Sequence, residues 1–346
     1  MSGGVDSSVA AYLMKQQGYD IIGVTLKLFD NEDIGSSDKT CCSTDDVMDA
    51  KAVASRLHIK HYTFNFKDDF KSQVIDRFVC AYENGRTPNP CIDCNRFIKF
   101  KRLLERAEVL GYPYVVSGHY AQVIYGGERP ILKKGKDHKK DQSYVLYSLT
   151  KEQLSHILLP LGEMTKDEVR EIAEANNFVN SKKHDSQDIC FVPDGKYAEF
   201  IEQYSHRTYP DGEFVDLSGN VLGTHKGIIR YTIGQRKGLN LSLPKPMYVC
   251  RTDLENNKVI LGDNEDLFSK TLYANDINLI ACDDIKTPLH LKAKIRYSQS
   301  EEWATVEQTG DDEIHVEFDN PQRAITKGQA VVLYDDDIVI GGGVIR

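Results

Sequence analysis

The chain has 346 residues, a length that predicts two or three domains rather than one. Its 40% hydrophobic and 27% charged residues are typical of a folded globular protein and exclude a largely disordered chain. A net charge of −9 at pH 7 argues against nonspecific nucleic-acid binding over the whole surface but leaves local basic patches open.

The N-terminus lacks a charged-then-apolar export signal, and no apolar run approaches the roughly 18 residues of a membrane span. We therefore expect a cytoplasmic protein without membrane contact. In that compartment the eight cysteines are expected to be reduced thiols, with catalysis or metal binding as their special uses. They are Cys41, Cys42, Cys80, Cys91, Cys94, Cys190, Cys250 and Cys282.

The first half of the chain alternates helical and strand patterns at the spacing of βαβ units. Helices are predicted over residues 7–17, 45–57, 69–84 and 94–110, and strands over residues 21–29, 61–66 and 114–120. Alternation of this kind predicts an α/β fold with a doubly wound, mostly parallel sheet. Its active site is expected at the carboxyl ends of the strands.

The second half changes character. Helices are predicted near residues 151–158, 165–176 and 196–204. From about residue 210, short alternating strands separated by turn signals such as Pro210-Asp211-Gly212 predict an all-β region. We place soft boundaries near residues 200 and 270, which divide the chain into domains over 1–200, 201–270 and 271–346.

A glycine-rich loop, Ser2-Gly3-Gly4-Val5-Asp6-Ser7-Ser8, stands directly before the first predicted helix. Its glycines allow close backbone approach, and its amide and hydroxyl donors would converge on an anion at the positive end of the helix. The spacing and the lysine of a Walker A loop are absent. An ordinary turn that caps a helix uses the same residue types, so the loop composition leaves both interpretations open.

The position of this loop in the chain is unusual. A phosphate loop is expected to follow a central parallel strand, yet only Met1 precedes it. Either the start is misassigned or truncated, or the sheet is built without that strand. We favour the first alternative, because a missing central strand would cost core burial.

Two cysteine pairs are candidates for special chemistry. Cys94 lies in the predicted first turn of a helix, which would lower its thiol pKa and make it a nucleophile. With Cys91 it forms a C-x-x-C motif that could instead be a redox pair or half of a zinc site. Cys41 and Cys42 could supply further zinc ligands, although adjacent cysteines are poorly spaced for chelation.

Two further features have simple structural explanations. Cys190 lies where a polar stretch becomes apolar, a position typical of a small core residue. Five lysines fall within eight residues, a cluster typical of a solvated hairpin or loop. They are Lys133, Lys134, Lys136, Lys139 and Lys140.

Nine segments, taken in order from residue 2 to the last residues, carry a resemblance to a known family. They are SGGVDSS (2–8), CCSTDD (41–46), GRTPNPCIDCNRFIKF (85–100), SGHYA (117–121), KDQSYVLY (140–147), HDSQDICFV (184–192), YTIGQRKGL (231–239), KIRYSQ (294–299) and GGGVI (341–345). Together they resemble the tRNA-specific 2-thiouridylase (MnmA) family of PP-loop ATP pyrophosphatases. PP-loop enzymes that act on small metabolites would share the first segment only.

The resemblance implies an ATP site and two catalytic cysteines. The Ser2–Ser8 loop would hold the ATP phosphates, with Leu26 bordering the adenosine and Gly118 closing the nucleotide site. Cys94 would be the nucleophile and Cys190 would carry the persulfide sulfur. The two thiols would join transiently as a disulfide.

The resemblance also implies a tRNA surface, with the C-terminal domain as a tRNA-binding β-barrel and the central domain as an adaptor. The residues facing the target base would be Asn89, Pro90 and Cys91. The other tRNA contacts would be His119, Lys140, Asp141, Gln142, Arg296, Tyr297 and Gln329. Some family members have aspartate where Cys91 stands; Asp93 is a possible substitute for that carboxylate, or it simply caps the helix.

The implied activity is that of a tRNA-uridine 2-sulfurtransferase. ATP would adenylate O2 of the wobble uridine, and a persulfide from a sulfur carrier or cysteine desulfurase would then displace AMP. Mg²⁺ would bridge the ATP phosphates, with Asp6 as a candidate ligand, directly or through water. The alternatives are a PP-loop enzyme acting on a small metabolite and a zinc-stabilised RNA-binding module without catalysis.

Overall fold

The computed structural model describes residues 1–30, 44–183, 189–192 and 195–346. Cys41, Cys42 and the first five residues of the HDSQDICFV segment (184–188) lie outside the described residues. The chain divides into two compact units, which are described separately. The first comprises residues 1–75, 90–195 and 337–339, and the second comprises residues 76–89, 196–336 and 340–346.

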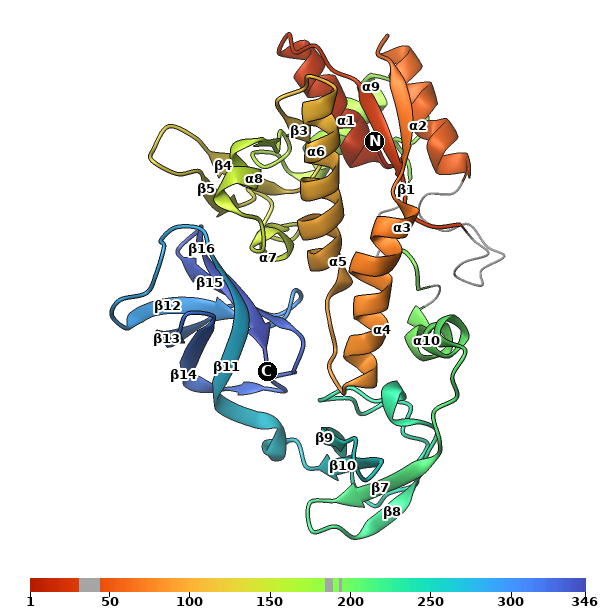
Figure 1. The fold of residues 1–346 in the computed structure, drawn as a ribbon, viewed down its shortest axis with the longest axis vertical. Coiled ribbons are helices and arrows are strands. Elements are labelled where there is room, and N and C mark those ends of the chain that lie inside the picture. The colour runs from red at the N-terminus through yellow and green to blue at the C-terminus, as the bar shows by residue number, and fades with distance from the viewer. Residues whose placement is uncertain (31–43, 184–188, 193–194) are drawn as a thin grey trace. The chain divides into compact units, whose positions relative to one another are not determined.

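Two pairs of parallel strands form the centre of the first unit (Figure 1). Strand β1 (Gly23–Lys27) pairs with β2 (His61–Asn65), and β3 (Val115–Val116) pairs with β6 (Ile157–Leu158). The helical segments are α1 (Val5–Gln16), α2 (Thr44–Arg56), α3 (Lys67–Phe70), η1 (Lys71–Ile75), α5 (Pro90–Asp93), η2 (Cys94–Arg102), α6 (Leu103–Val109), α7 (Ser143–Leu146), α8 (Lys151–Ser155) and α9 (Lys166–Ala175).

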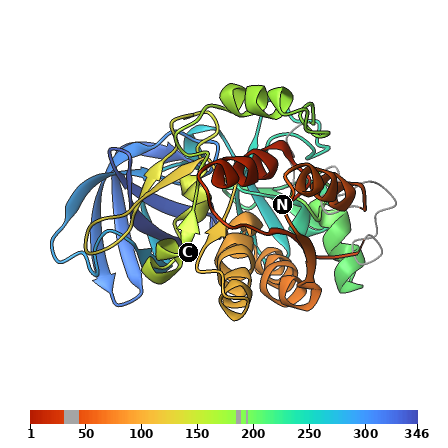
Figure 2. The ribbon, with the colours of Figure 1, turned by 90° about the horizontal axis from the view of Figure 1, so that it is seen from above.

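Helices cover both faces of these strands, which confirms the doubly wound α/β fold. Seen from above, α1, α2 and α9 lie on one side of the strands and α6 lies on the other (Figure 2). The first three helices share one core, to which each contributes residues at helical spacing, such as Val5 and Val9 of α1 and Val169 and Ala173 of α9. This packing fixes the start of α1 relative to the start of α9.

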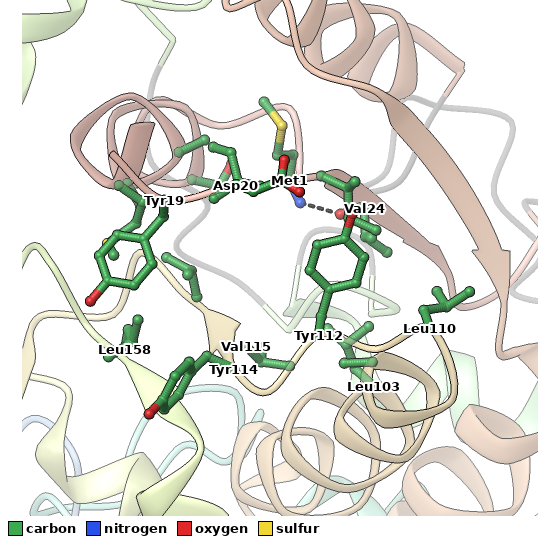
Figure 3. A pocket seen from close by; sticks show the side chains of 18 of the residues that line it. Met1, Tyr19, Asp20, Val24, Leu103, Leu110, Tyr112, Tyr114, Val115 and Leu158 are labelled. Atoms are coloured by element: carbon green, nitrogen blue, oxygen red, sulfur yellow. Dashed lines mark hydrogen bonds between the residues drawn. The ribbon is translucent and has the colours of Figure 1, made fainter. Parts of the chain in front are cut away.

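A cavity of about 370 Å³ is lined by residues of both strand pairs, among them residues of β1 and β3. Its walls are apolar side chains of the strands and of α1 and α6, including Val24, Val115 and Leu103 (Figure 3). Met1 lies at its edge, where the terminal ammonium donates to the Val24 carbonyl oxygen and the Met1 carbonyl oxygen accepts from the Thr25 hydroxyl at 2.7 Å. Among the described residues, β1 pairs with β2 and β3 with β6, and no strand joins the two pairs.

The second unit is rich in β structure, as predicted. A mixed sheet has the strand order β8-β7-β10-β9. Its strands are β7 (Gly212–Asp216), β8 (Val221–His225), β9 (Tyr248–Asp253) and β10 (Lys258–Gly262). The helical segments of this unit are α4 (Asp76–Glu83), α10 (Tyr197–Ser205), η4 (Ile228–Arg230) and η5 (Glu265–Leu267).

The C-terminal strands form a closed barrel in the order β11-β14-β13-β12-β15-β16, with β16 pairing back to β11. Side chains of β12 alternate between the core of the barrel and its surface. Leu291 and Ala293 are buried, whereas His290 is exposed. The six strands are β11 (Phe268–Leu279), β12 (Leu289–Lys294), β13 (Glu302–Gly310), β14 (Glu313–Arg323), β15 (Ala330–Asp335) and β16 (Ile338–Ile345).

Several details differ from the sequence predictions. The helix expected near residues 151–158 ends at Ser155, and Ile157–Leu158 form strand β6. The helix expected from residue 94 begins at Pro90, because proline suits the first helical position, where its missing N–H is not needed. The strand expected over residues 114–120 is only β3, since the chain leaves the sheet at Ser117. A hairpin of β4 (Ala121–Ile124) and β5 (Ile131–Lys134) was not predicted as strands. Among the described residues, the structure contains no helix long and apolar enough to cross a membrane.

Candidate nucleotide and sulfur-transfer site

The glycine-rich loop folds tightly onto the start of α1. Gly3 has a φ of +74°, a left-handed conformation that favours glycine, and a Cβ there would meet the Asp46 carbonyl oxygen at 2.5 Å. Gly4 is the N-cap of α1 and supplies no side-chain cap. The Ser7 hydroxyl donates to the Gly4 carbonyl oxygen at 3.1 Å and accepts from the Ser2 amide at 3.1 Å. The helix therefore begins with the open amide end that binds anions.

Side chains from other segments hold this loop. The Asn180 amide donates to the Gly3 carbonyl oxygen and to the Ser8 hydroxyl, both at 2.9 Å. The Lys183 ammonium pairs with Asp46 at 2.6 Å and with Asp49 at 2.8 Å. Asn180 is 2% exposed, so its hydrogen bonds are shielded from water. The loop is thus supported from the segment that follows α9.

The Asp6 side chain is held by two residues from distant parts of the chain. Its two carboxylate oxygens lie 2.8 and 2.9 Å from the Lys166 ammonium. One of them also accepts a hydrogen bond from the Tyr120 hydroxyl at 2.8 Å. Gly118 packs against the same residue, because a Cβ at Gly118 would meet the Asp6 carbonyl carbon at 2.8 Å. The structure thus brings Asp6 and Gly118 together.

Leu26 lies on β1, where it pairs with Phe64 of β2 and is partly buried. This strand position is compatible with the predicted place beside an adenosine. The assignment of Leu26 to the nucleotide remains a prediction.

The thiol of Cys94 differs from the sequence prediction. Because the helix begins at Pro90, Cys94 lies beyond its first turn, and it opens the π-helical stretch η2. The side chain is 7% exposed. Burial raises the pKa of Cys94 to about 11, although Lys99 acts in the opposite direction. The expectation of a lowered pKa is therefore wrong for this structure, and the thiol needs a proton acceptor before it can act as a nucleophile.

Cys190 lies in the same unit as Cys94. Its neighbour Phe191 is buried and packs edge-on against Phe70, with ring centroids 5.7 Å apart. Phe70 ends α3, and α3 and η1 pack against η2, the segment that Cys94 opens. Cys190 itself is half-buried. The residue after Cys190 thus packs on α3, which itself packs against the segment that Cys94 opens.

The predicted base-facing segment spans both units, since Asn89 belongs to the second and Pro90 and Cys91 to the first. Cys91 is exposed and Pro90 is buried. Asp93 lies inside the helix that begins at Pro90 and makes no capping hydrogen bond, so the capping alternative is wrong. Among the described residues, no group of three or more histidine, cysteine, aspartate or glutamate side chains could hold a metal ion.

Two of the residues predicted to contact tRNA near the lysine cluster also hold the chain together. The Asp141 carboxylate accepts hydrogen bonds from the Gly135 amide at 3.0 Å and from the Ser143 hydroxyl at 2.8 Å. The Gln142 side-chain oxygen accepts from the Tyr120 amide at 3.0 Å. Asp141 is buried, whereas Lys139 is exposed and Lys140 is partly exposed. Lys139 and Lys140 are therefore more accessible to solvent than Asp141.

The lysine cluster is more than a solvated loop. The Lys136 ammonium pairs with Glu168 at 3.0 Å, and the Lys136 amide donates to the Gly162 carbonyl oxygen at 2.8 Å. Asp137 accepts from the Lys166 amide at 3.1 Å. The loop is therefore attached to the first turn of α9.

His119 is 7% exposed and its ring lies 5.7 Å from that of Phe100. Its Nδ1 is 2.7 Å from the Ser117 hydroxyl oxygen. Burial, with a smaller contribution from Lys99, holds the pKa of His119 well below its usual range, so the ring is neutral. Its contact with tRNA stays a prediction, and in the structure the ring contacts Ser117 and Phe100.

The tRNA contacts predicted for the second unit are of two kinds. The Arg296 guanidinium donates to the carbonyl oxygens of Ile233 at 3.2 Å and Ala324 at 2.9 Å. The Gln329 amide donates to the Thr87 carbonyl oxygen at 2.5 Å. Tyr297, in contrast, is 41% exposed. Arg296 and Gln329 thus brace the unit, and Tyr297 offers an aromatic surface.

Sequence reasoning missed several residues that contact the loop, among them Tyr120, Lys166 and Asn180. Tyr120 lies within the SGHYA segment, in which the sequence analysis assigned roles to Gly118 and His119 but none to the Tyr120 hydroxyl. Lys166 begins a helix with a Thr165/Glu168 capping box. That capping box predicts a helix start, but it contains no signal that the start faces a loop 160 residues earlier.

Comparison with known proteins agrees with this geometry. A model of the tRNA methyl transferase HUP domain matches residues 1–194, a tRNA methyl transferase PRC-barrel domain matches residues 198–263, and an aminomethyltransferase β-barrel domain matches residues 269–345. The chain therefore belongs to the proteins that join a HUP domain to these two β domains.

Curated relatives narrow that class. The tRNA-specific 2-thiouridylase MnmA of Clostridioides difficile (strain 630) is 52% identical over 348 residues, covering 100% of this chain and 96% of the relative. The protein of the same name from Acetivibrio thermocellus is 49% identical over 350 residues, covering 100% and 98%. The chain belongs to the tRNA-specific 2-thiouridylase MnmA family, as its sequence motifs predicted.

A solved structure of NMN synthetase from Francisella tularensis covers 60% of this chain and 76% of its own, with 17% identity and a TM-score of 0.34. A likeness of that size carries no argument about this protein.

Proposed function

We propose that this protein is a tRNA-uridine 2-sulfurtransferase that makes 2-thiouridine at the wobble position. The observation that carries the proposal is the identity of about half of all residues, over the whole chain, with relatives named as tRNA-specific 2-thiouridylases. The geometry supports it, because an open helix start with a braced glycine loop suits a nucleotide phosphate. No observation favours a small-metabolite substrate.

The first step is activation of the uridine. O2 of the base attacks the α-phosphorus of ATP, a P–O bond forms, and pyrophosphate leaves. In the next step O2 of the uridine leaves as part of AMP, which is a far better leaving group than oxide. The Ser2–Ser8 loop and the start of α1 would bind the phosphates, with Leu26 and Gly118 bordering the nucleoside. Mg²⁺ would neutralise the phosphates.

The second step is sulfur transfer. The terminal sulfur of a persulfide on Cys190 attacks C2 of the base, and AMP leaves. If the sulfur remains joined to Cys190, attack by the Cys94 thiolate on the Cys190 sulfur releases 2-thiouridine and leaves a Cys94–Cys190 disulfide. An external thiol reductant then restores both thiols. Alternatively, the Cys94 thiolate attacks the Cys190 sulfur of the persulfide first, which forms the Cys94–Cys190 disulfide and expels hydrosulfide, and hydrosulfide then attacks C2 and displaces AMP.

The partners follow from this chemistry. We propose that a sulfur carrier or a cysteine desulfurase supplies the persulfide, and that the lysine cluster and Tyr297 contact tRNA. We divide the chain into a catalytic domain (1–200), a central adaptor (201–270) and a tRNA-binding barrel (271–346). The cytoplasm, where tRNA and ATP occur together, is the proposed compartment.

The decisive experiment mixes the protein with ATP, unmodified tRNA and a protein persulfide donor. We expect pyrophosphate release that depends on tRNA, and 2-thiouridine at the wobble position by mass spectrometry of tRNA digests. Omission of the donor should stop thiolation but not pyrophosphate release. Pyrophosphate release that is indifferent to tRNA would contradict the proposal.

A further inference from the structure

The phosphate loop has no lysine of its own, yet a lysine lies against it. In Walker A loops a lysine within the motif reaches the β- and γ-phosphates. Here the Lys166 ammonium bridges both oxygens of the Asp6 carboxylate, at 2.8 and 2.9 Å. The Lys166 side chain is 7% exposed and that of Asp6 is 31% exposed. The ion pair is therefore shielded on the lysine side and open on the side of the loop.

The backbone around Lys166 is firmly held. Lys166 is the first residue of α9, whose N-cap Thr165 forms a reciprocal capping box with Glu168. The Lys166 amide donates to the Asp137 carboxylate at 3.1 Å. Because α9 packs against α1, the backbone at Lys166 cannot move away from α1 without disturbing the shared core, and the ion pair with Asp6 holds the side chain. The ammonium is thus pre-positioned beside the anion-binding end of α1.

The Lys166 ammonium changes the charge that a triphosphate meets at this loop. A triphosphate that approaches the start of α1 meets the carboxylate of Asp6, and like charges at contact distance repel. Lys166 neutralises that carboxylate. An ammonium in a shielded site interacts more strongly with a phosphate than a solvated one, since water competes less.

We propose that Lys166 binds the nucleotide phosphates directly and replaces the lysine that the loop itself lacks. Asp6 and Tyr120 hold the ammonium at the loop, and Asp137 fixes the backbone that carries it. The proposal rests on the proposed function, because it takes ATP as the ligand of this loop. It makes Lys166 a binding residue and Asp137 a positioning residue.

The test is calorimetric titration of the full chain without tRNA, at fixed free Mg²⁺. The two ligands are α,β-methylene-ATP, which cannot release pyrophosphate, and adenosine. Lys166→Met should weaken binding of the ATP analogue by about ten- to a hundredfold, as expected for a lost charged hydrogen bond, and change adenosine binding by less than about twofold. Lys166→Arg should keep part of the affinity for the analogue. Lys226→Met, which breaks an exposed pair with Asp211, is the matched control.

A double variant separates phosphate contact from simple neutralisation of Asp6. In Asp6→Asn/Lys166→Met both charges are removed, so the protein keeps its fold even if the single variant, with its unpaired Asp6, does not. Binding of the ATP analogue should stay at least about tenfold weaker than in Asp6→Asn. Equal binding by these two variants would overturn the proposal. The wild-type titration tests the proposed function itself, since a chain that does not bind the analogue has no ATP site.

Discussion

The two units use polar side chains in different ways. In the first, the candidate site is built from contacts between side chains, such as the bridge of Lys166 to Asp6 and the hydroxyl of Tyr120 on the same carboxylate. In the second, the predicted tRNA residues Arg296 and Gln329 donate to backbone carbonyl oxygens. We therefore expect Asp6 to act at the site, and Arg296 and Gln329 to serve the structure of the second unit. The predictions that follow test this difference.

The largest effect is expected from the cysteines. Cys94→Ser and Cys190→Ser should reduce thiolation to the level of the blank and spare tRNA-dependent pyrophosphate release, because a hydroxyl neither carries a persulfide nor forms a disulfide. Thiolated tRNA and pyrophosphate are measured on the same samples. Cys80→Ser, on an exposed helix position of the second unit, is the control. Thiolation by Cys190→Ser from a protein persulfide donor would exclude the proposed sulfur route.

Asp6→Ala should lower tRNA-dependent pyrophosphate release by more than about a hundredfold and leave tRNA affinity within about twofold. The variant leaves the Lys166 ammonium without its carboxylate partner, so the charge at the loop changes as well as its shape. Initial rates of pyrophosphate release and tRNA binding by filter retention test the two halves of this prediction. Undiminished release would remove the loop from the active site.

Arg296→Ala should destabilise the second unit by about 2 to 3 kcal/mol, since a half-buried guanidinium loses its carbonyl partners. Tyr297→Ala should change stability by less than about 0.5 kcal/mol, because its ring is exposed, and should weaken tRNA binding. Urea unfolding and tRNA affinity are measured for both variants. If Arg296→Ala keeps full stability and loses tRNA affinity, the contrast between the two units fails.

The alkylation rate of Cys94 should rise by about tenfold per pH unit from pH 8 to pH 10, without the plateau near pH 9 of an ordinary thiol. The sign follows from the thiolate being the reactive form: burial raises the pKa to about 11, so the reactive fraction still increases throughout this range. Mass spectrometry of the Cys94 peptide after timed iodoacetamide pulses gives the rate. A plateau below pH 9 would restore the activated thiol that the helix motif predicted.

Neutralising Lys133, Lys139 and Lys140 together should give the smallest effect, a several-fold loss of tRNA affinity at moderate salt. Each lost phosphate contact should reduce the slope of log affinity against log salt by about 0.7 to 0.9. Affinities at four or five salt concentrations give the slope. Lys136→Ala, which breaks the pair with Glu168 instead, is the comparison. An unchanged slope would mean that these lysines only solvate the loop.

Sequence patterns predicted the features that depend on residues close together in the chain. The turn at Gly3, the helix that follows it and the β-rich second half are local properties of composition and periodicity. The pKa of Cys94 was mispredicted because burial, which depends on tertiary packing, outweighs the helix end. Lys166 was missed because its role depends on α9 lying beside α1, a contact between segments distant in the chain.

The hydrogen bond from the Lys166 amide to Asp137 joins two places that bind different substrates in the proposed reaction. Any tRNA contact that shifts the lysine-rich loop would also shift the start of α9, and with it the ammonium at the nucleotide loop. Thermodynamic linkage makes such coupling reciprocal, so a tRNA that tightens nucleotide binding by some factor must itself be bound more tightly, by that same factor, in the presence of nucleotide. Cooperativity between the two substrates would then be a property of one short loop, and it would vanish in Asp137→Ala.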